Sequence, residues 1–76
     1  MIVSEENVDL ANTLRGQIQD GTETVSDGEG VAMLLLWGFF ADHARFENMD
    51  VETLARNQFE AFLDYARNNV ALVRQH

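Results

Sequence analysis

The chain lacks cysteine, proline and lysine, and each absence narrows what the protein can be. Without cysteine it has neither a disulfide framework nor a thiolate metal site, although a chain of 76 residues has little core to rely on. Without proline it has no residue that forces a break in a long helix. Without lysine, five arginines face 13 acidic residues, and the net charge is −8. This balance argues against direct binding to nucleic acid, which needs a cationic surface.

The sequence features of a secretory signal peptide and of a membrane-spanning helix are also missing. The first residues, MIVSEEN, carry acids where a signal peptide has basic residues. The most apolar run, VAMLLLWGFFA at residues 31–41, is much shorter than the roughly 20 residues that cross a bilayer. We therefore expect a cytoplasmic protein without membrane partners.

Residues that cap helices mark three helix starts. Ser4 is placed to cap a first helix, which Gly21 is placed to end in a left-handed turn. Ser26 and Glu29 form a capping box for a second helix, and Asp50 is placed to cap a third. The fold class predicted is all-α, a three-helix bundle with a hydrophobic central helix, forming a single domain over residues 1–76. The predicted helices cover about residues 5–19, 27–47 and 51–74.

Two apolar stripes lie on nearly opposite faces of the predicted central helix. One consists of Met33, Trp37, Phe40 and Ala44, and the other of Val31, Leu35, Phe39 and Phe46. Two neighbouring helices cover only part of a helix that is apolar all round, so we expect the second stripe to meet another chain in a two-fold homodimer. A compact monomer whose loops complete the lid is the alternative. The predicted dimer or partner interface comprises Val31, Leu35, Phe39, Phe46, Leu54, Tyr65 and Leu72.

Patterns that suggest chemistry are weak. His43 and Glu47 stand four residues apart, a spacing that suits a metal, but two ligands make no site, and an exposed helical pair explains them better. Gly28 and Gly30 precede a predicted helix without the lysine of a phosphate loop, so we interpret them as a flexible start to that helix. No nucleophile has a base beside it in the sequence. We expect no catalytic residues, no cofactor and no bound metal.

Charged residues suggest two further surfaces. Arg56, Arg67 and Arg74 align along the polar face of the third predicted helix. There they either bind an acidic partner or face solvent with partial ion pairing. An acidic partner surface is predicted from the first helix across the following loop. It consists of Asp9, Asp20, Glu23, Asp27 and Glu29.

The leading functional hypothesis is a non-catalytic interaction module that pairs with itself and binds and inhibits or regulates another protein. In size and charge the chain is similar to the small acidic inhibitors that phages and mobile elements carry, although it shares no motif with them. One alternative is a nucleic-acid mimic whose acids occupy the basic groove of a DNA- or RNA-binding protein. Another is an assembly or dimerisation subunit of a larger complex.

Overall fold

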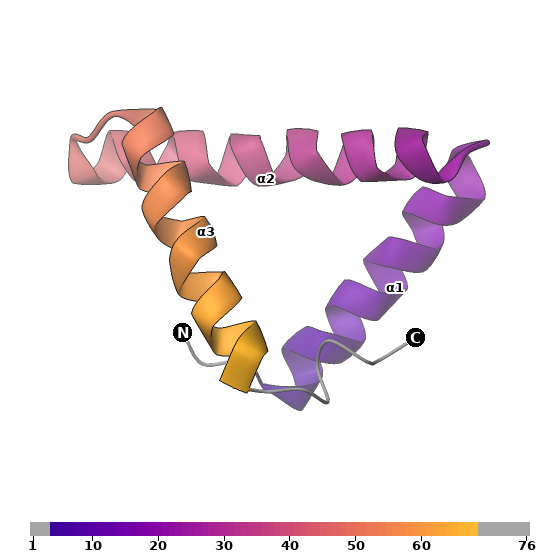
Figure 1. Ribbon diagram of the computed structural model, residues 1–76. Coiled ribbons are helices and arrows are strands. Elements are labelled where there is room, and N and C mark those ends of the chain that lie inside the picture. The colour runs from indigo at the N-terminus through magenta and orange to yellow at the C-terminus, as the bar shows by residue number, and fades with distance from the viewer. Residues whose placement is uncertain (1–3, 69–76) are drawn as a thin grey trace. The chain divides into compact units, whose positions relative to one another are not determined.

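A computed structural model describes residues 4–68 of the chain (Figure 1). In that range the protein consists of three α-helices and no strand. They are α1 (Glu5–Gly21), α2 (Val25–Glu47) and α3 (Val51–Asn68). The prediction of an all-α chain with three helices is thereby confirmed for the described residues, whereas the bundle arrangement and the homodimer stay predictions.

The chain divides into two compact units, and the boundary falls inside α2. The first, Ile2–Phe39, holds α1 and the larger part of α2. The second, Phe40–His76, holds the end of α2 together with α3. Each unit is therefore a pair of helical segments joined by a short connection.

The start of α1 agrees with the sequence. The Ser4 hydroxyl accepts a hydrogen bond from the backbone N–H of Asn7 at 3.1 Å, which satisfies one of the unpaired donors of the first turn. Glu5 and Glu6 follow in that turn, where their negative charge opposes the positive end of the helix dipole.

The predicted end of α1 is wrong. Gly21 belongs to the helix, and the cap is Thr22, whose backbone is extended (φ −126°, ψ 154°). No glycine among the described residues has a positive φ. The Thr22 hydroxyl donates to the carbonyl of Ile18 at 2.8 Å and so satisfies the last turn without a left-handed residue.

The start of α2 also differs from the prediction. The helix begins at Val25, two residues early, so Ser26 lies inside it and forms no capping box with Glu29. The cap is Thr24, whose hydroxyl accepts from the N–H of Asp27 at 3.0 Å. Thr24 offers the same hydroxyl acceptor as serine and stands two residues earlier in the chain, so the helix begins after Thr24 and not after Ser26. Gly28 is therefore a residue of α2 rather than a flexible start to it.

The connection between α2 and α3 is a tight cap. Asn48 has a positive φ of 55°, its N–H donates to Arg45, and the N–H of Met49 donates to Ala44 at 2.8 Å. These two bonds form a Schellman motif, in which asparagine takes the place more often held by glycine. Asp50 then caps α3, as the sequence predicts, by accepting from the N–H of Thr53 at 3.0 Å. The predicted end of α3 lies outside the described residues.

Candidate functional site

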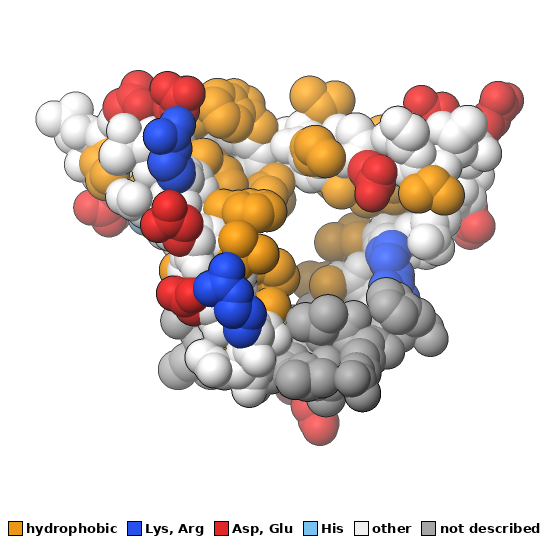
Figure 2. Space-filling view, in the orientation of Figure 1, with side chains coloured by type: hydrophobic (Ala, Val, Ile, Leu, Met, Phe, Trp, Pro, Cys, Tyr) orange, Lys and Arg blue, Asp and Glu red, His pale blue; other side chains and the backbone are white. Residues whose placement is uncertain are grey.

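Burial is scarce in the part of the chain that the structure describes. Ala44 (0% exposed) and Leu54 (4%) are its only buried hydrophobic residues, and both belong to the second unit. Figure 2 shows hydrophobic side chains at the surface along α2. The large hydrophobic residues that remain exposed are Leu10, Leu14, Val25, Val31, Met33, Leu34, Leu35, Leu36, Trp37, Phe39, Phe46, Met49, Phe59, Phe62 and Leu63.

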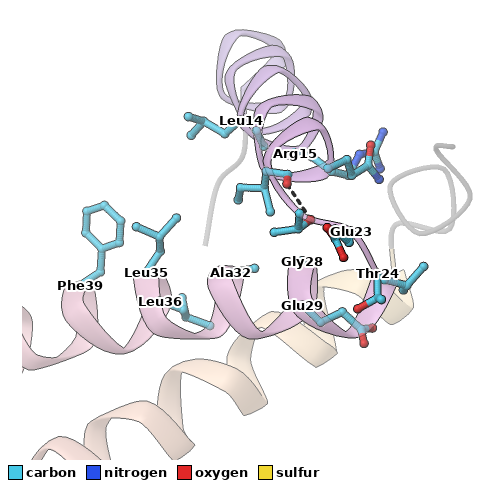
Figure 3. Close-up of a pocket in the computed structure, with 15 residues that line it drawn as sticks. Leu14, Arg15, Glu23, Thr24, Gly28, Glu29, Ala32, Leu35, Leu36 and Phe39 are labelled. Carbon is cyan, nitrogen blue, oxygen red and sulfur yellow. Dashed lines mark hydrogen bonds between the residues drawn. The ribbon is translucent and has the colours of Figure 1, made fainter.

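An apolar groove lies within the first unit, between α1 and α2, and has a volume of about 860 Å³. We call it the α1–α2 groove. Figure 3 shows Leu35 and Phe39 pointing from α2 toward the side on which Leu14 lies on α1. Leu35 is 51% exposed and Phe39 is 70% exposed, so α1 leaves this stripe largely uncovered. The apolar lining includes Ala11, Leu14, Ile18, Ala32, Leu35, Leu36 and Phe39.

Gly28 marks a place where the two helices lie close together. A Cβ at this position would lie 3.4 Å from the Thr22 hydroxyl and 3.7 Å from Cγ2 of Ile18. At Gly16, farther along α1, a Cβ would meet nothing within 4 Å. The helices are therefore in contact beside their connection, and the groove is open where Leu14 and Phe39 stand.

Charged side chains line the groove near that connection. Glu23 and Glu29 lie there, and Arg15 of α1 belongs to the lining as well, although Figure 3 shows its side chain on the side of α1 away from Leu14. Among the described residues, the ion pairs found join other side chains, and none includes Glu23, Glu29 or Arg15. Arg15 is the only basic residue of the sequence Ile2–Phe39, against seven acids, which gives this unit a net charge of −6.

A second apolar surface of the first unit lies on the other side of α2. Met33, Leu34 and Trp37 are 66%, 74% and 51% exposed, and none of them lines the groove. At 100° per residue, Met33 and Trp37 lie on the helix side opposite Leu35 and Phe39. A Cβ at Gly30 or Gly38 would meet nothing within 4 Å. We call Gly30, Met33, Leu34, Trp37 and Gly38 the outer face of α2.

No protein-family model matches the chain, and comparisons with curated proteins and with solved structures give no match.

The predicted interface residues fall in different places. Leu35 and Phe39 lie in the groove, while Val31 (37% exposed) and Phe46 (87%) are exposed without lining it. Leu54 is buried in the second unit and offers no surface to a partner. Tyr65 is half-buried, and Leu72 lies outside the described residues.

The sequence left open which apolar stripe of α2 faces inward. In the structure, a different stripe faces the neighbouring helix in each unit. The stripe with Leu35 and Phe39 faces α1 in the first unit, while Ala44 of the other stripe is buried in the second. Sequence reasoning missed the groove because its existence depends on how α1 packs on α2. The one available signal was Gly28, a small residue at a place where α2 lies close to Ile18 of α1.

The predicted acidic surface is exposed but is not one cluster of groove residues. Asp9, Asp20, Glu23, Asp27 and Glu29 are all exposed, and only Glu23 and Glu29 line the groove. The predicted arginine stripe is partly paired. Arg56 lies 3.6 Å from Glu52 and Arg67 lies 2.8 Å from Asp64, while Arg74 is outside the described residues.

His43 and Glu47 form the expected exposed pair, with 3.8 Å between imidazole Nε2 and carboxylate Oε1. Within residues 4–68, no three His, Cys, Asp or Glu side chains gather closely enough to hold a metal ion. In the same range, no helix has the length and hydropathy needed to cross a membrane.

Proposed function

We propose that the chain is a non-catalytic interaction module that forms a two-fold homodimer through the outer face of α2 and that binds and regulates a second protein. The observation that carries the proposal is the exposure of fifteen large hydrophobic side chains among the described residues, where Ala44 and Leu54 are the only buried hydrophobic residues. Extensive apolar patches on soluble proteins mark interaction surfaces. The cytoplasmic location and the likeness to phage inhibitors remain predictions from the sequence.

Charge favours the outer face over the groove as the dimer surface. No charged residue occurs in the sequence between Glu29 and Asp42, so the outer face from Gly30 to Gly38 has no carboxylate of its own to repel a second copy. Gly30 and Gly38 leave room there for a neighbouring helix. The stripe that the sequence favoured for the dimer, with Leu35 and Phe39, lies in a groove with carboxylates near one end. A second copy placed there would bring its own negative charge to them.

Neighbouring leucines on α2 allow a matched test. We expect sedimentation equilibrium over a dilution series to give twice the chain mass of 8.6 kDa. Leu34→Gln should weaken association about a hundredfold, because a two-fold interface loses the buried leucine twice. Leu35→Gln makes the same chemical change one residue away, in the groove, and should leave the mass unchanged.

Each contrary result has a definite meaning. A wild-type mass of one chain at every concentration would refute the homodimer. Dissociation by Leu35→Gln and not by Leu34→Gln would move the dimer to the groove stripe. Far-ultraviolet circular dichroism of both variants checks that the helices survive, since leucine and glutamine have similar helix propensities.

A further inference from the structure

We infer that the α1–α2 groove is the binding site for a basic amphipathic helix of another protein, with apolar anchors along the groove and a cationic side chain at Glu23 and Glu29. The inference rests on the proposed interaction role and names the class of partner. It uses a surface separate from the one assigned to the dimer, so that each can fail without the other.

The dimensions of the groove fit a helix. Its lining on α2 runs from Val25 to Phe39, and the apolar part beyond Glu29, from Ala32 to Phe39, spans about 10 Å at 1.5 Å per residue. That length matches about two turns of a partner helix. An amphipathic helix bound in this way presents anchors at positions i, i+3 or i+4, and i+7 to a hydrophobic groove.

The distribution of polarity along the groove sets the character of the anchors. Leu14, Leu35 and Phe39 stand at its open part and are 44%, 51% and 70% exposed. Large apolar side chains of the partner would remove these three from water. Because burial of a leucine side chain is favourable and non-directional, the groove selects apolar size rather than one particular residue.

Charge near the connection of the two helices selects a basic partner over an acidic one. Glu23 and Glu29 have no ion-pair partner among the described residues, and together with Arg15 they give the lining of the groove a net charge of −1. The unit that contains them carries seven acids and one arginine. A lysine or arginine of the partner would gain charge-assisted hydrogen bonds there, whereas a glutamate would be repelled.

Three synthetic helical peptides test the inference on the full chain by isothermal titration calorimetry at low salt. The first has leucines on one face and lysines at one end and on the other face. The second replaces each lysine by glutamate, and the third has the composition of the first in an order that abolishes the apolar face. We expect saturable binding of one copy of the first peptide per chain, and no binding of the other two.

Two pairs of variants locate the site. Leu35→Gln should raise the dissociation constant of the first peptide about tenfold or more, whereas Leu34→Gln, on the outer face, should leave it unchanged. Glu29→Gln should raise it about two- to fivefold at low salt, as expected for an exposed charge pair. Asp9→Asn removes the same charge from an exposed residue outside the groove and should have no effect.

Several outcomes overturn the inference. Failure of the first peptide to bind excludes the groove as a site for such a helix, and equal binding of the glutamate peptide excludes the charge selection. Equal effects of Leu34→Gln and Leu35→Gln would place the peptide elsewhere. Binding that high salt abolishes completely would assign it to the acidic surface alone, as the nucleic-acid mimic alternative predicts. None of these outcomes bears on the homodimer, which the sedimentation experiment tests separately.

Discussion

The two units of the chain are built alike but differ in how many hydrophobic residues they bury. Each joins two helical segments through a short connection, yet among residues 4–68 both buried hydrophobic residues belong to the second unit and none to the first. The difference begins at the connections. In the second unit the turn at Asn48 is a Schellman motif, and Ala44, whose carbonyl accepts one of its bonds, is fully buried. In the first unit the helices touch beside Gly28 and leave an open groove.

Charge follows the same division. The sequence of the second unit carries six acids and four arginines, a net charge of −2, against −6 for the first. The three ion pairs found among the described residues all lie in the second unit. The comparison indicates that the second unit is the better packed and the less charged of the two, and that the first leaves its apolar surface uncovered.

The largest expected effect is the loss of the second unit's core. Leu54→Ala should lower the free energy of unfolding by about 2–5 kcal/mol, because Leu54 is 4% exposed and its truncation leaves a cavity. Leu35→Ala, in the first unit, should cost much less, because that side chain is 51% exposed. Urea unfolding followed by circular dichroism compares the two. Equal losses would contradict the division into a closed and an open unit.

The next effect concerns the connection in the first unit. Thr24→Ala should cost about 1 kcal/mol, because it removes the hydroxyl that accepts from Asp27. Ser26→Ala should change the free energy of unfolding by less than about 0.5 kcal/mol, since Ser26 is exposed within the helix. Thermal unfolding of the two variants ranks them. The reverse order would restore Ser26 as the cap.

A smaller effect of opposite sign is expected at the glycines. Gly16→Ala should stabilise the chain by about 0.5–1 kcal/mol, because alanine favours the helix and the added methyl group meets nothing within 4 Å. Gly28→Ala should gain less, since its methyl group would lie 3.4 Å from the Thr22 hydroxyl. The same unfolding experiments measure both. An equal gain at the two positions would mean that α1 and α2 do not approach at Gly28.

The smallest effect is expected at the surface charges of the second unit. Arg67→Gln should cost less than about 1 kcal/mol, although the pair with Asp64 is only 2.8 Å long, because both side chains are about 70% exposed. The cost should fall further in high salt, which screens exposed charges. Unfolding at two salt concentrations measures this. A salt-independent loss of several kcal/mol would give the arginine a structural role.

The features that could be predicted from the sequence are those that depend on residues close together in the chain. Ser4 and Asp50 cap their helices as predicted, because a side chain that accepts from an N–H three residues on is a short-range feature. Thr24 and Ser26 compete for the same helix start, and the sequence rules favoured the wrong one because glutamate follows Ser26 at capping-box spacing. Tertiary features were less accessible. Leu54 was predicted to lie at an interface with another chain, yet it is buried within the second unit, whereas Phe59, another large hydrophobic residue of α3, is 50% exposed.

Trp37 gives the outer face of α2 a spectroscopic label of its own. It is the only tryptophan of the chain, it is 51% exposed, and it does not line the groove. Indole fluorescence shifts to shorter wavelength when water is removed from around the ring. Emission at high dilution should therefore shift to longer wavelength as the proposed dimer separates, whereas a peptide that enters the groove should leave it nearly unchanged. The natural chain thus carries its own optical sensor for one of its two faces, without a label or a substitution.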